Sequence, residues 1–199
     1  MFSWVDFREG RMRRILWVSC LILITGSAAM ALELVTNGAF EDEFAPAWQE
    51  DNVGQGASVA RSVSFDGDAD FEALAQKGTG NGHAKLDQVV VLPTLDVHFS
   101  VTAKMQASAS TGGPWAAAGL ALAYEDYFGH LLGTTYIVAK TTLCPWVDGD
   151  RVHVIEVPDE EWNGYAFVLD DELVNLAGVD PLSVHQLRIS LVSQTGGDC

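Results

Sequence analysis

Apolar and polar residues alternate with a period of two along most of the chain, a pattern typical of β-strands. The segment 97–107 is the clearest case, because apolar residues hold every second position from Phe99 to Met105 and polar residues hold the others. Such a strand has one buried and one solvent-facing side. The same reasoning predicts strands over 58–65, 72–77, 83–92, 131–139, 152–157, 166–169 and 186–192.

Three segments need separate arguments. A helix is the alternative for the alanine-rich run 116–124, but Leu120, Leu122 and Tyr124 recur at period two, so we predict a strand. A short strand is also expected at the start of 34–48, before an Asn-Gly turn. The segment 170–178 breaks the alternation, with an N-cap Asp, acids in the first turn and a terminal Gly, and predicts one helix.

About ten short strands with Gly- and Pro-rich connections and one short helix define the fold class. No strand–helix–strand alternation is present, which argues against a parallel sheet. We therefore predict an all-β fold, a two-sheet antiparallel jelly-roll β-sandwich with one short helix.

The first 31 residues have the three parts of a secretory signal peptide. A basic segment at 11–14 precedes an apolar run at 15–25, and Ala29-Met-Ala31 matches a cleavage site. The run is too short for a membrane-spanning helix, which needs about 20 residues. We predict a signal peptide at 1–31, a sandwich domain at 32–199, and a secreted protein, extracellular or periplasmic. An uncleaved anchor helix is the alternative, and Met12 is an alternative start.

Charge excludes two classes of partner. The formal net charge is −16, and beyond residue 31 seven basic residues face 25 acidic ones. Nucleic-acid affinity depends on Lys and Arg neutralising phosphates, so no nucleic-acid partner is expected. After signal cleavage the same charge disfavours an anionic membrane surface.

Two cysteines remain after the signal, Cys144 and Cys199. In an oxidising compartment we expect them to form a disulfide bond, with two reduced thiols as the alternative. Neither has the histidine neighbours that a zinc site needs.

Several motifs recur in one order along the chain and carry a family resemblance. The run Leu34-Val-Thr-Asn-Gly-Ala-Phe-Glu41, followed by Pro46-Ala-Trp48, resembles the first strand of carbohydrate-binding modules of the galactose-binding jelly-roll type. Leu86-Asp-Gln88 resembles the Gln-containing strand of that family, and Trp162-Asn-Gly-Tyr-Ala-Phe167 resembles its W-x-x-Y-x-F strand. The resemblance covers most of 33–192 and implies a non-catalytic module that binds polysaccharide or another glycan.

The resemblance also implies one structural calcium ion. Glu41 matches the ligand position of the family, and Glu43 or Asp42 is placed to help, since calcium binds several oxygen ligands. The alternative is that these are solvated acids. The closing strand lacks the late acidic residue that often completes such a site, and the helix at 170–178 is an addition to the family pattern.

Sugar recognition uses exposed aromatic rings, so aromatics in Gly- or Pro-containing loops are the candidates. Trp115, Tyr127 and Trp146 meet this condition, with ordinary packing as the alternative for each. The aromatics that match packing positions are interpreted as core: Trp48, Trp162, Tyr165 and Phe167.

Enzyme signatures are missing from the sequence. It contains no G-x-S-x-G, no H-E-x-x-H and no phosphate-binding glycine loop, and adjacent acids such as Asp159 and Glu160 point to opposite faces of a strand. We therefore predict no enzyme. The second hypothesis is a cell-surface structural or protein-interaction domain on the same sandwich, with cell-surface proteins as its partners.

Overall fold

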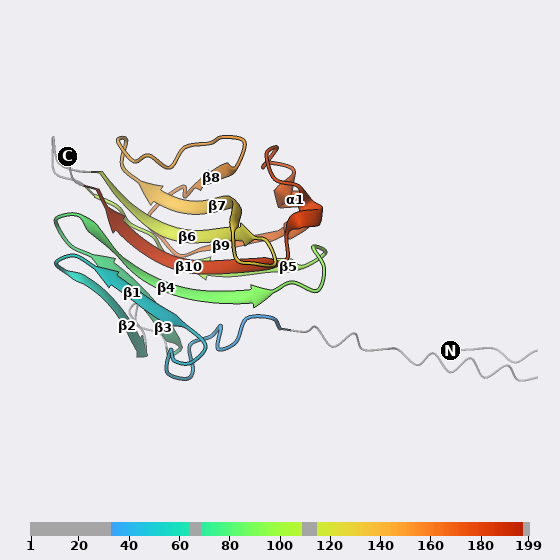
Figure 1. Cartoon of the computed structure of the whole chain (residues 1–199). Helices are drawn as coiled ribbons and strands as arrows, with labels where there is room; N and C mark the ends of the chain where they lie inside the picture. Colours follow the sequence, from blue (N-terminus) through green and yellow to red (C-terminus); the bar gives the residue numbers. More distant parts are fainter. Residues whose placement is uncertain (1–32, 64–68, 109–114, 197–199) are drawn as a thin grey trace, which may run out of the picture. The chain divides into compact units, whose positions relative to one another are not determined.

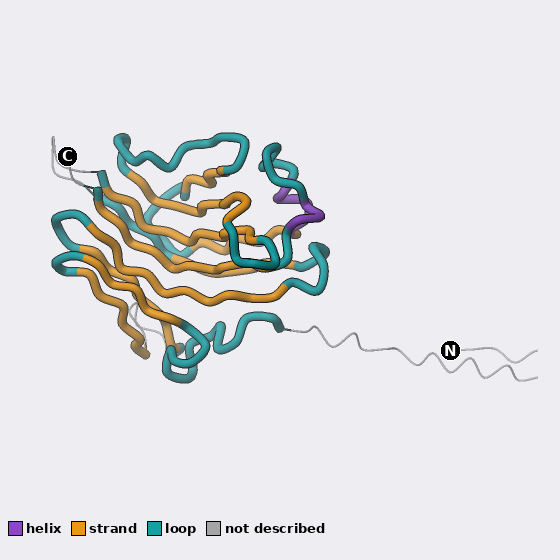
Figure 2. Tube along the Cα trace, in the orientation of Figure 1, coloured by secondary structure: helices purple, strands orange, loops and turns teal. Residues whose placement is uncertain are grey.

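The computed structural model describes residues 33–63, 69–108 and 115–196, and these form a body of β-strands (Figures 1 and 2). The helical segments are short: α1 spans Leu169–Leu173 and the 3-10 turn η1 spans Pro181–Ser183. The strands are β1 (Gln49–Val53), β2 (Ala57–Val63), β3 (Phe71–Lys77), β4 (Gly82–Val91), β5 (His98–Ala103), β6 (Ala116–Glu125), β7 (Leu131–Lys140), β8 (Val152–Glu156), β9 (Asn163–Val168) and β10 (Gln186–Thr195).

Six strands form the main sheet, in the order β1-β4-β10-β6-β7-β8. Its centre is long and regular, because β10 pairs with β4 and with β6 along its whole length. In the described part of the chain the strand pairs are antiparallel, except for the edge pair β7–β8, which is parallel and departs from the prediction of a purely antiparallel sandwich. The loop 141–151 provides the return path that a parallel pair requires.

Two short ribbons, β2–β3 and β5–β9, cover one face of the main sheet and form the second layer of the sandwich. The buried core lies between the layers, and Tyr124, Leu122 and Ile137 are fully buried in it. Phe99 and Phe167 pack on it from the second layer, with their ring centroids 5.3 Å apart. The jelly-roll β-sandwich predicted from the strand pattern is therefore the fold of the domain.

Because successive side chains of a strand point to opposite faces, the face of the main sheet away from the core carries a different set of residues. On β6 the positions between the core residues hold Gly119, Ala121 and Ala123, so this face carries small side chains along the middle of the sheet. The strand predicted for 116–124 is confirmed over its helical alternative, because period-two burial of Leu120 and Leu122 requires an extended chain.

The predicted helix is present but shorter. It spans Leu169–Leu173, its N-cap is Val168 rather than Asp170, and no side chain of the described residues caps its N-terminus. Asp170 instead lies in the first turn, where an acidic side chain suits the partial positive charge of a helix N-terminus. Within the part of the chain that is described, no helix is long and apolar enough to cross a membrane.

The opening segment 33–48 contains turns and no strand, so the strand expected there is wrong. The backbone of Thr36 pairs instead with the Gln88 side chain, whose Oε1 accepts from Thr36 N at 2.7 Å and whose Nε2 donates to Thr36 O at 2.8 Å. Asn37 and Phe40 adopt positive φ angles of 53° and 54°, which no strand allows. Trp48 is buried, as predicted, and its Nε1 donates to Thr36 O.

Candidate ligand-binding groove

A groove of about 360 Å³ lies on the face of the main sheet that carries small side chains. Its floor consists of Ala121 and Ala123 on β6 together with Ser190 and Val192 on β10. The ladder places Ser190 beside Ala121, so these short side chains form one continuous low strip. The volume falls within the range of small-molecule sites.

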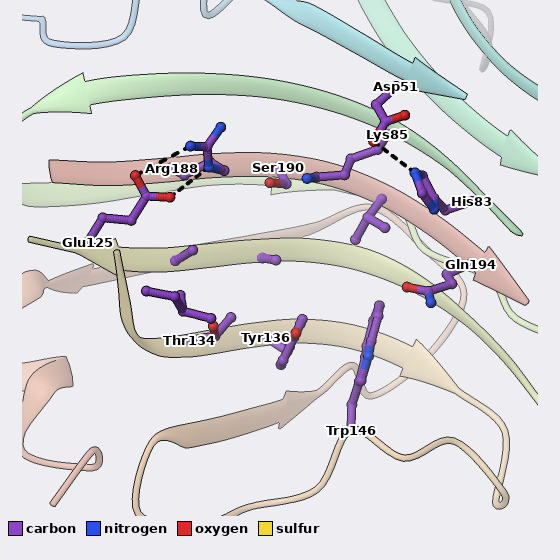
Figure 3. Close-up of a pocket in the computed structure, with 14 residues that line it drawn as sticks. Asp51, His83, Lys85, Glu125, Thr134, Tyr136, Trp146, Arg188, Ser190 and Gln194 are labelled. Carbon is purple, nitrogen blue, oxygen red and sulfur yellow. Dashed lines mark hydrogen bonds and ion pairs between the residues drawn. The ribbon is translucent and has the colours of Figure 1, made fainter. Parts of the chain in front are cut away.

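Two stacked aromatic rings form one wall of the groove. Tyr136 on β7 lies beside Ala121, and the ring of Trp146 stacks on it with centroids 4.3 Å apart and planes 10° from parallel. Figure 3 shows both rings standing on the groove side of the sheet. The two rings give this wall an extended apolar surface next to a floor of small residues.

The loop that carries Trp146 is fastened to the sheet. Lys140 Nζ donates to Trp146 O at 2.9 Å and pairs with Glu156 at 3.1 Å. Farther along the loop, Asp148 Oδ1 accepts from Val154 N at 2.8 Å. These bonds hold Trp146 in place before any ligand binds, which lowers the entropic cost of binding.

Behind the aromatic wall lies a second, small apolar cluster. Ala117, Val138 and Cys144 are buried in it, and Trp115 contacts Trp146 with ring centroids 6.2 Å apart. Burial raises the pKa of the Cys144 thiol and of the Tyr136 hydroxyl. Trp146 is therefore packed against this cluster as well as against Tyr136.

Paired polar side chains stand at both ends of the groove (Figure 3). At one end Arg188 donates from Nε to Glu125 Oε1 at 2.7 Å and from Nη2 to Oε2 at 3.4 Å. At the other end His83 Nε2 lies 2.9 Å from Asp51 Oδ2. Lys85, which also lines the groove, pairs with Asp87 at 2.8 Å. Arg188 and Lys85 thus each have a carboxylate partner.

The predicted sugar-binding aromatics are placed in three different ways. Trp146 lines the groove, Trp115 packs against Trp146 without lining it, and Tyr127 projects from the β6–β7 hairpin with 72% of its surface exposed. Trp162, interpreted as core, is 38% exposed, whereas Tyr165 and Phe167 do pack on the core.

Several groove residues were not among the sequence candidates. Tyr136, Glu125 and Arg188 lie on regular strands, where sequence reasoning assigns aromatics to the core and charges to solvent. The available signal is the alternation of β7, in which Thr134 and Tyr136 share the face opposite to Ile137. This alternation identifies a site only when the pairing register of the neighbouring strands is also known.

The residues around Glu41 and Glu43 do not fit a calcium ion as they are arranged. Both side chains are exposed, and Arg61 already occupies the backbone oxygens: its Nε donates to Phe40 O at 2.5 Å and its Nη2 to Glu41 O. Arg61 Nη1 also lies 3.8 Å from Glu43 Oε1. Among the described residues, no group of three or more His, Cys, Asp and Glu side chains is placed to hold a metal.

Three predictions fall on residues outside the described ranges. The signal peptide at 1–31 lies before Glu33, the proposed domain start at 32 is likewise outside, and Cys199 follows the last described residue. The Cys144–Cys199 disulfide therefore stays a prediction. Cys144 itself is buried beside Trp146, 5% exposed.

No protein-family model matches the sequence, and no curated protein matches it. Among solved structures, the enzymatically active domain of bacteriophage CBA120 tailspike protein 4 is similar, with 12% identity and a TM-score of 0.44. The match covers 84% of this chain but only 19% of the tailspike chain.

Two solved structures of a family 11 carbohydrate-binding module from Clostridium thermocellum are also similar, each at 16% identity. One, from the cellulosomal cellulase Lic26A-Cel5E, has a TM-score of 0.36 and is matched over 80% of this chain and 92% of its own. The other, in complex with a β-1,3-1,4-mixed-linked tetrasaccharide, has a TM-score of 0.37 and is matched over 79% and 89%. At such identities, the ligand of this chain has to be argued from its own groove.

Proposed function

We propose that the chain is an exported, non-catalytic domain that binds a neutral carbohydrate chain in the groove of the main sheet. The observation that carries the proposal is the Tyr136–Trp146 wall, which presents aromatic rings beside a floor of small residues. Aromatic rings of this kind pack against the apolar faces of sugar rings, while nearby polar groups bond the hydroxyls.

The charge arrangement favours a neutral ligand. The two basic residues Arg188 and Lys85 each have a carboxylate partner within 3 Å, Glu125 and Asp87, and the Asp51 carboxylate lies 2.9 Å from His83 Nε2. An ionic ligand would have to compete with these pairs, and a ligand with hydroxyl groups would bond to their free edges. The neutral side chains Thr134, Ser190 and Gln194 add further donors and acceptors.

The predicted signal peptide and the acidic surface suit a domain that meets its ligand outside the cytoplasm. Polysaccharides are abundant there, and a neutral chain experiences no repulsion from a protein with this charge. In this proposal the protein is secreted and holds its ligand without cleaving it.

The test is affinity electrophoresis through gels that contain one polysaccharide each: mixed-linkage β-glucan, xyloglucan, xylan, galactomannan or starch. We expect at least one polymer to retard the native protein and to stay intact. Trp146→Ala should weaken that retardation at least about tenfold, because a central aromatic side chain carries much of the binding energy.

Trp162→Ala is the matched control, since Trp162 is a partly exposed indole that does not line the groove. Equal retardation of the native protein and the Trp146→Ala variant would place the ligand elsewhere. Retardation by none of the polymers, with recovery of a protein partner instead, would favour the alternative of a protein-interaction domain.

A further inference from the structure

The β6–β7 hairpin presents two aromatic rings that the groove does not use. Tyr127 and Phe128 are 72% and 78% exposed, and their rings meet edge to face with centroids 5.5 Å apart. An exposed aromatic pair at the tip of a hairpin leaves apolar surface in contact with water. Such exposed apolar groups often mark a binding surface.

The hairpin is held rigidly by the side chain of Asp126. Its Oδ1 accepts from Phe128 N at 2.8 Å and from His130 N at 2.9 Å, while its Oδ2 lies 2.9 Å from His130 Nδ1. Gly129, with a φ of 82°, closes the turn, and its N–H donates to Asp126 O at 3.1 Å. The backbone that carries the two rings is therefore held in place.

The hairpin also borders the groove. Glu125 and Leu131, which flank the loop on either side, both line it. Gln186 Nε2 donates to Tyr127 O at 3.2 Å, and Gln186 lies on the same face of β10 as the groove residues Arg188 and Ser190. The aromatic tip thus lies at the Glu125–Arg188 end of the groove.

The aromatic wall and the hairpin are separated along β6. Tyr136 lies beside Ala121, and Glu125 is four residues farther along the strand, which is roughly 13 Å at a strand rise of about 3.3 Å per residue. An extended chain that lies along this strip meets the Tyr136–Trp146 wall first, then the polar end of the groove, and then the hairpin.

We propose that the Tyr127–Phe128 hairpin is a second stacking subsite, which binds a polysaccharide chain where it leaves the groove. This inference rests on the proposed function, and it specifies the ligand as a polymer that extends beyond the groove rather than a short oligosaccharide or a chain end. The contributions of the hairpin and of the Tyr136–Trp146 wall to the binding free energy should add, since the two surfaces are far enough apart to bind different sugar units.

The test compares the native protein with two variants by isothermal titration calorimetry. The ligands are the polysaccharide of the gel panel that retards the native protein most strongly and its own oligosaccharides of increasing length. The native protein should gain affinity with length. The variant Tyr127→Ala/Phe128→Ala should bind the shortest bound oligosaccharide as the native protein does and the polymer about tenfold more weakly.

Leu182→Ala is the control for removing an exposed apolar side chain outside the groove, since Leu182 is 89% exposed. Native-like affinity of the hairpin variant for every length, with binding lost in Trp146→Ala, would overturn the second subsite alone. Native-like affinity of Trp146→Ala for every length, or no binding by the native protein, would overturn the groove proposal itself.

Discussion

Arg188 covers the buried carboxylate of Glu125 at the end of the groove, with its Nε 2.7 Å from Oε1 and its Nη2 3.4 Å from Oε2. The Glu125 side chain is 5% exposed and the Arg188 side chain 34%. Among the residues that the structure describes, Arg188 is the ion partner of this carboxylate, whereas the guanidinium also reaches water.

Removing that partner should destabilise the domain. We expect Arg188→Met to lower the free energy of unfolding by about 2 kcal/mol, since an uncompensated buried carboxylate is costly and partial exposure of the pair reduces the loss. The combination Glu125→Leu/Arg188→Met removes both charges and should lie within about 1 kcal/mol of the native protein. Urea unfolding measures both.

Lys104→Met is the control for the loss of an exposed ion pair, because Lys104 and Glu161 lie 3.5 Å apart in solvent. It should change stability by less than about 0.5 kcal/mol. A double variant as unstable as Arg188→Met would show that the cost lies in packing rather than in the uncompensated carboxylate.

The stack of Tyr136 on Trp146 gives a second prediction. Tyr136→Leu should lower stability by about 1 kcal/mol and weaken polysaccharide retardation, since it removes the ring that fixes Trp146. Tyr136→Phe keeps the ring, so its stability and its retardation by the polysaccharide should match those of the native protein. If Tyr136→Leu binds as well as the native protein, Trp146 holds its orientation through its loop alone.

Much of the fold follows from the sequence because the alternation of apolar residues is strong. Leu120, Leu122 and Tyr124 define β6 in spite of its alanine content, and the resulting strand is the centre of the sheet. The prediction of a strand in the opening segment 33–48 was wrong for an identifiable reason. The backbone of this segment bonds to the Gln88 side chain, 52 residues away, and no local pattern encodes that contact.

The site was predictable only in part. Trp146 stands in a loop beside a proline, so its exposure could be expected, but its partner Tyr136 lies on a regular strand. The groove exists because the register places Ser190 and Tyr136 on either side of Ala121. Pairing between strands that are distant in sequence is set by the whole fold, so the site required the structure.

Two tyrosines with raised pKa values give a prediction for alkaline pH. Burial raises the pKa of Tyr124 and of Tyr136 above the ordinary value of 10.0. Above pH 10 the unfolded chain therefore loses protons that the folded chain keeps, and stability falls as pH rises. Each tyrosine adds up to about 1.4 kcal/mol per pH unit to the slope.

The stability of the variant Tyr124→Phe/Tyr136→Phe should decline less steeply above pH 10, measured by urea unfolding at a series of pH values. Tyr127→Phe removes an exposed hydroxyl and serves as the control. A decline as steep in the double variant as in the native protein would assign the alkaline sensitivity to other groups.

Side-chain cations hold the turns of the second layer. The Lys77 ammonium lies 2.9–3.2 Å from four backbone oxygens, those of Gln55, Gly78, Thr79 and Gly80. Arg61 binds the carbonyls of Phe40 and Glu41 and lies 3.6 Å from the centre of the Phe71 ring. Backbone carbonyls are the ligands that a structural calcium ion also uses.

Arg61 therefore competes with the calcium ion that the resemblance predicts at Glu41. We expect a chelator to leave the melting temperature of the native protein unchanged, because the guanidinium already neutralises these oxygens. Arg61→Met should lower stability by about 2 kcal/mol, since two charge-assisted hydrogen bonds and a cation–π contact are lost. Arg61→Lys should recover little of this lost stability, because an ammonium lacks the planar guanidinium group that reaches both carbonyls. A melting temperature that falls on chelation, and no longer does so in Glu41→Ala, would establish the ion instead.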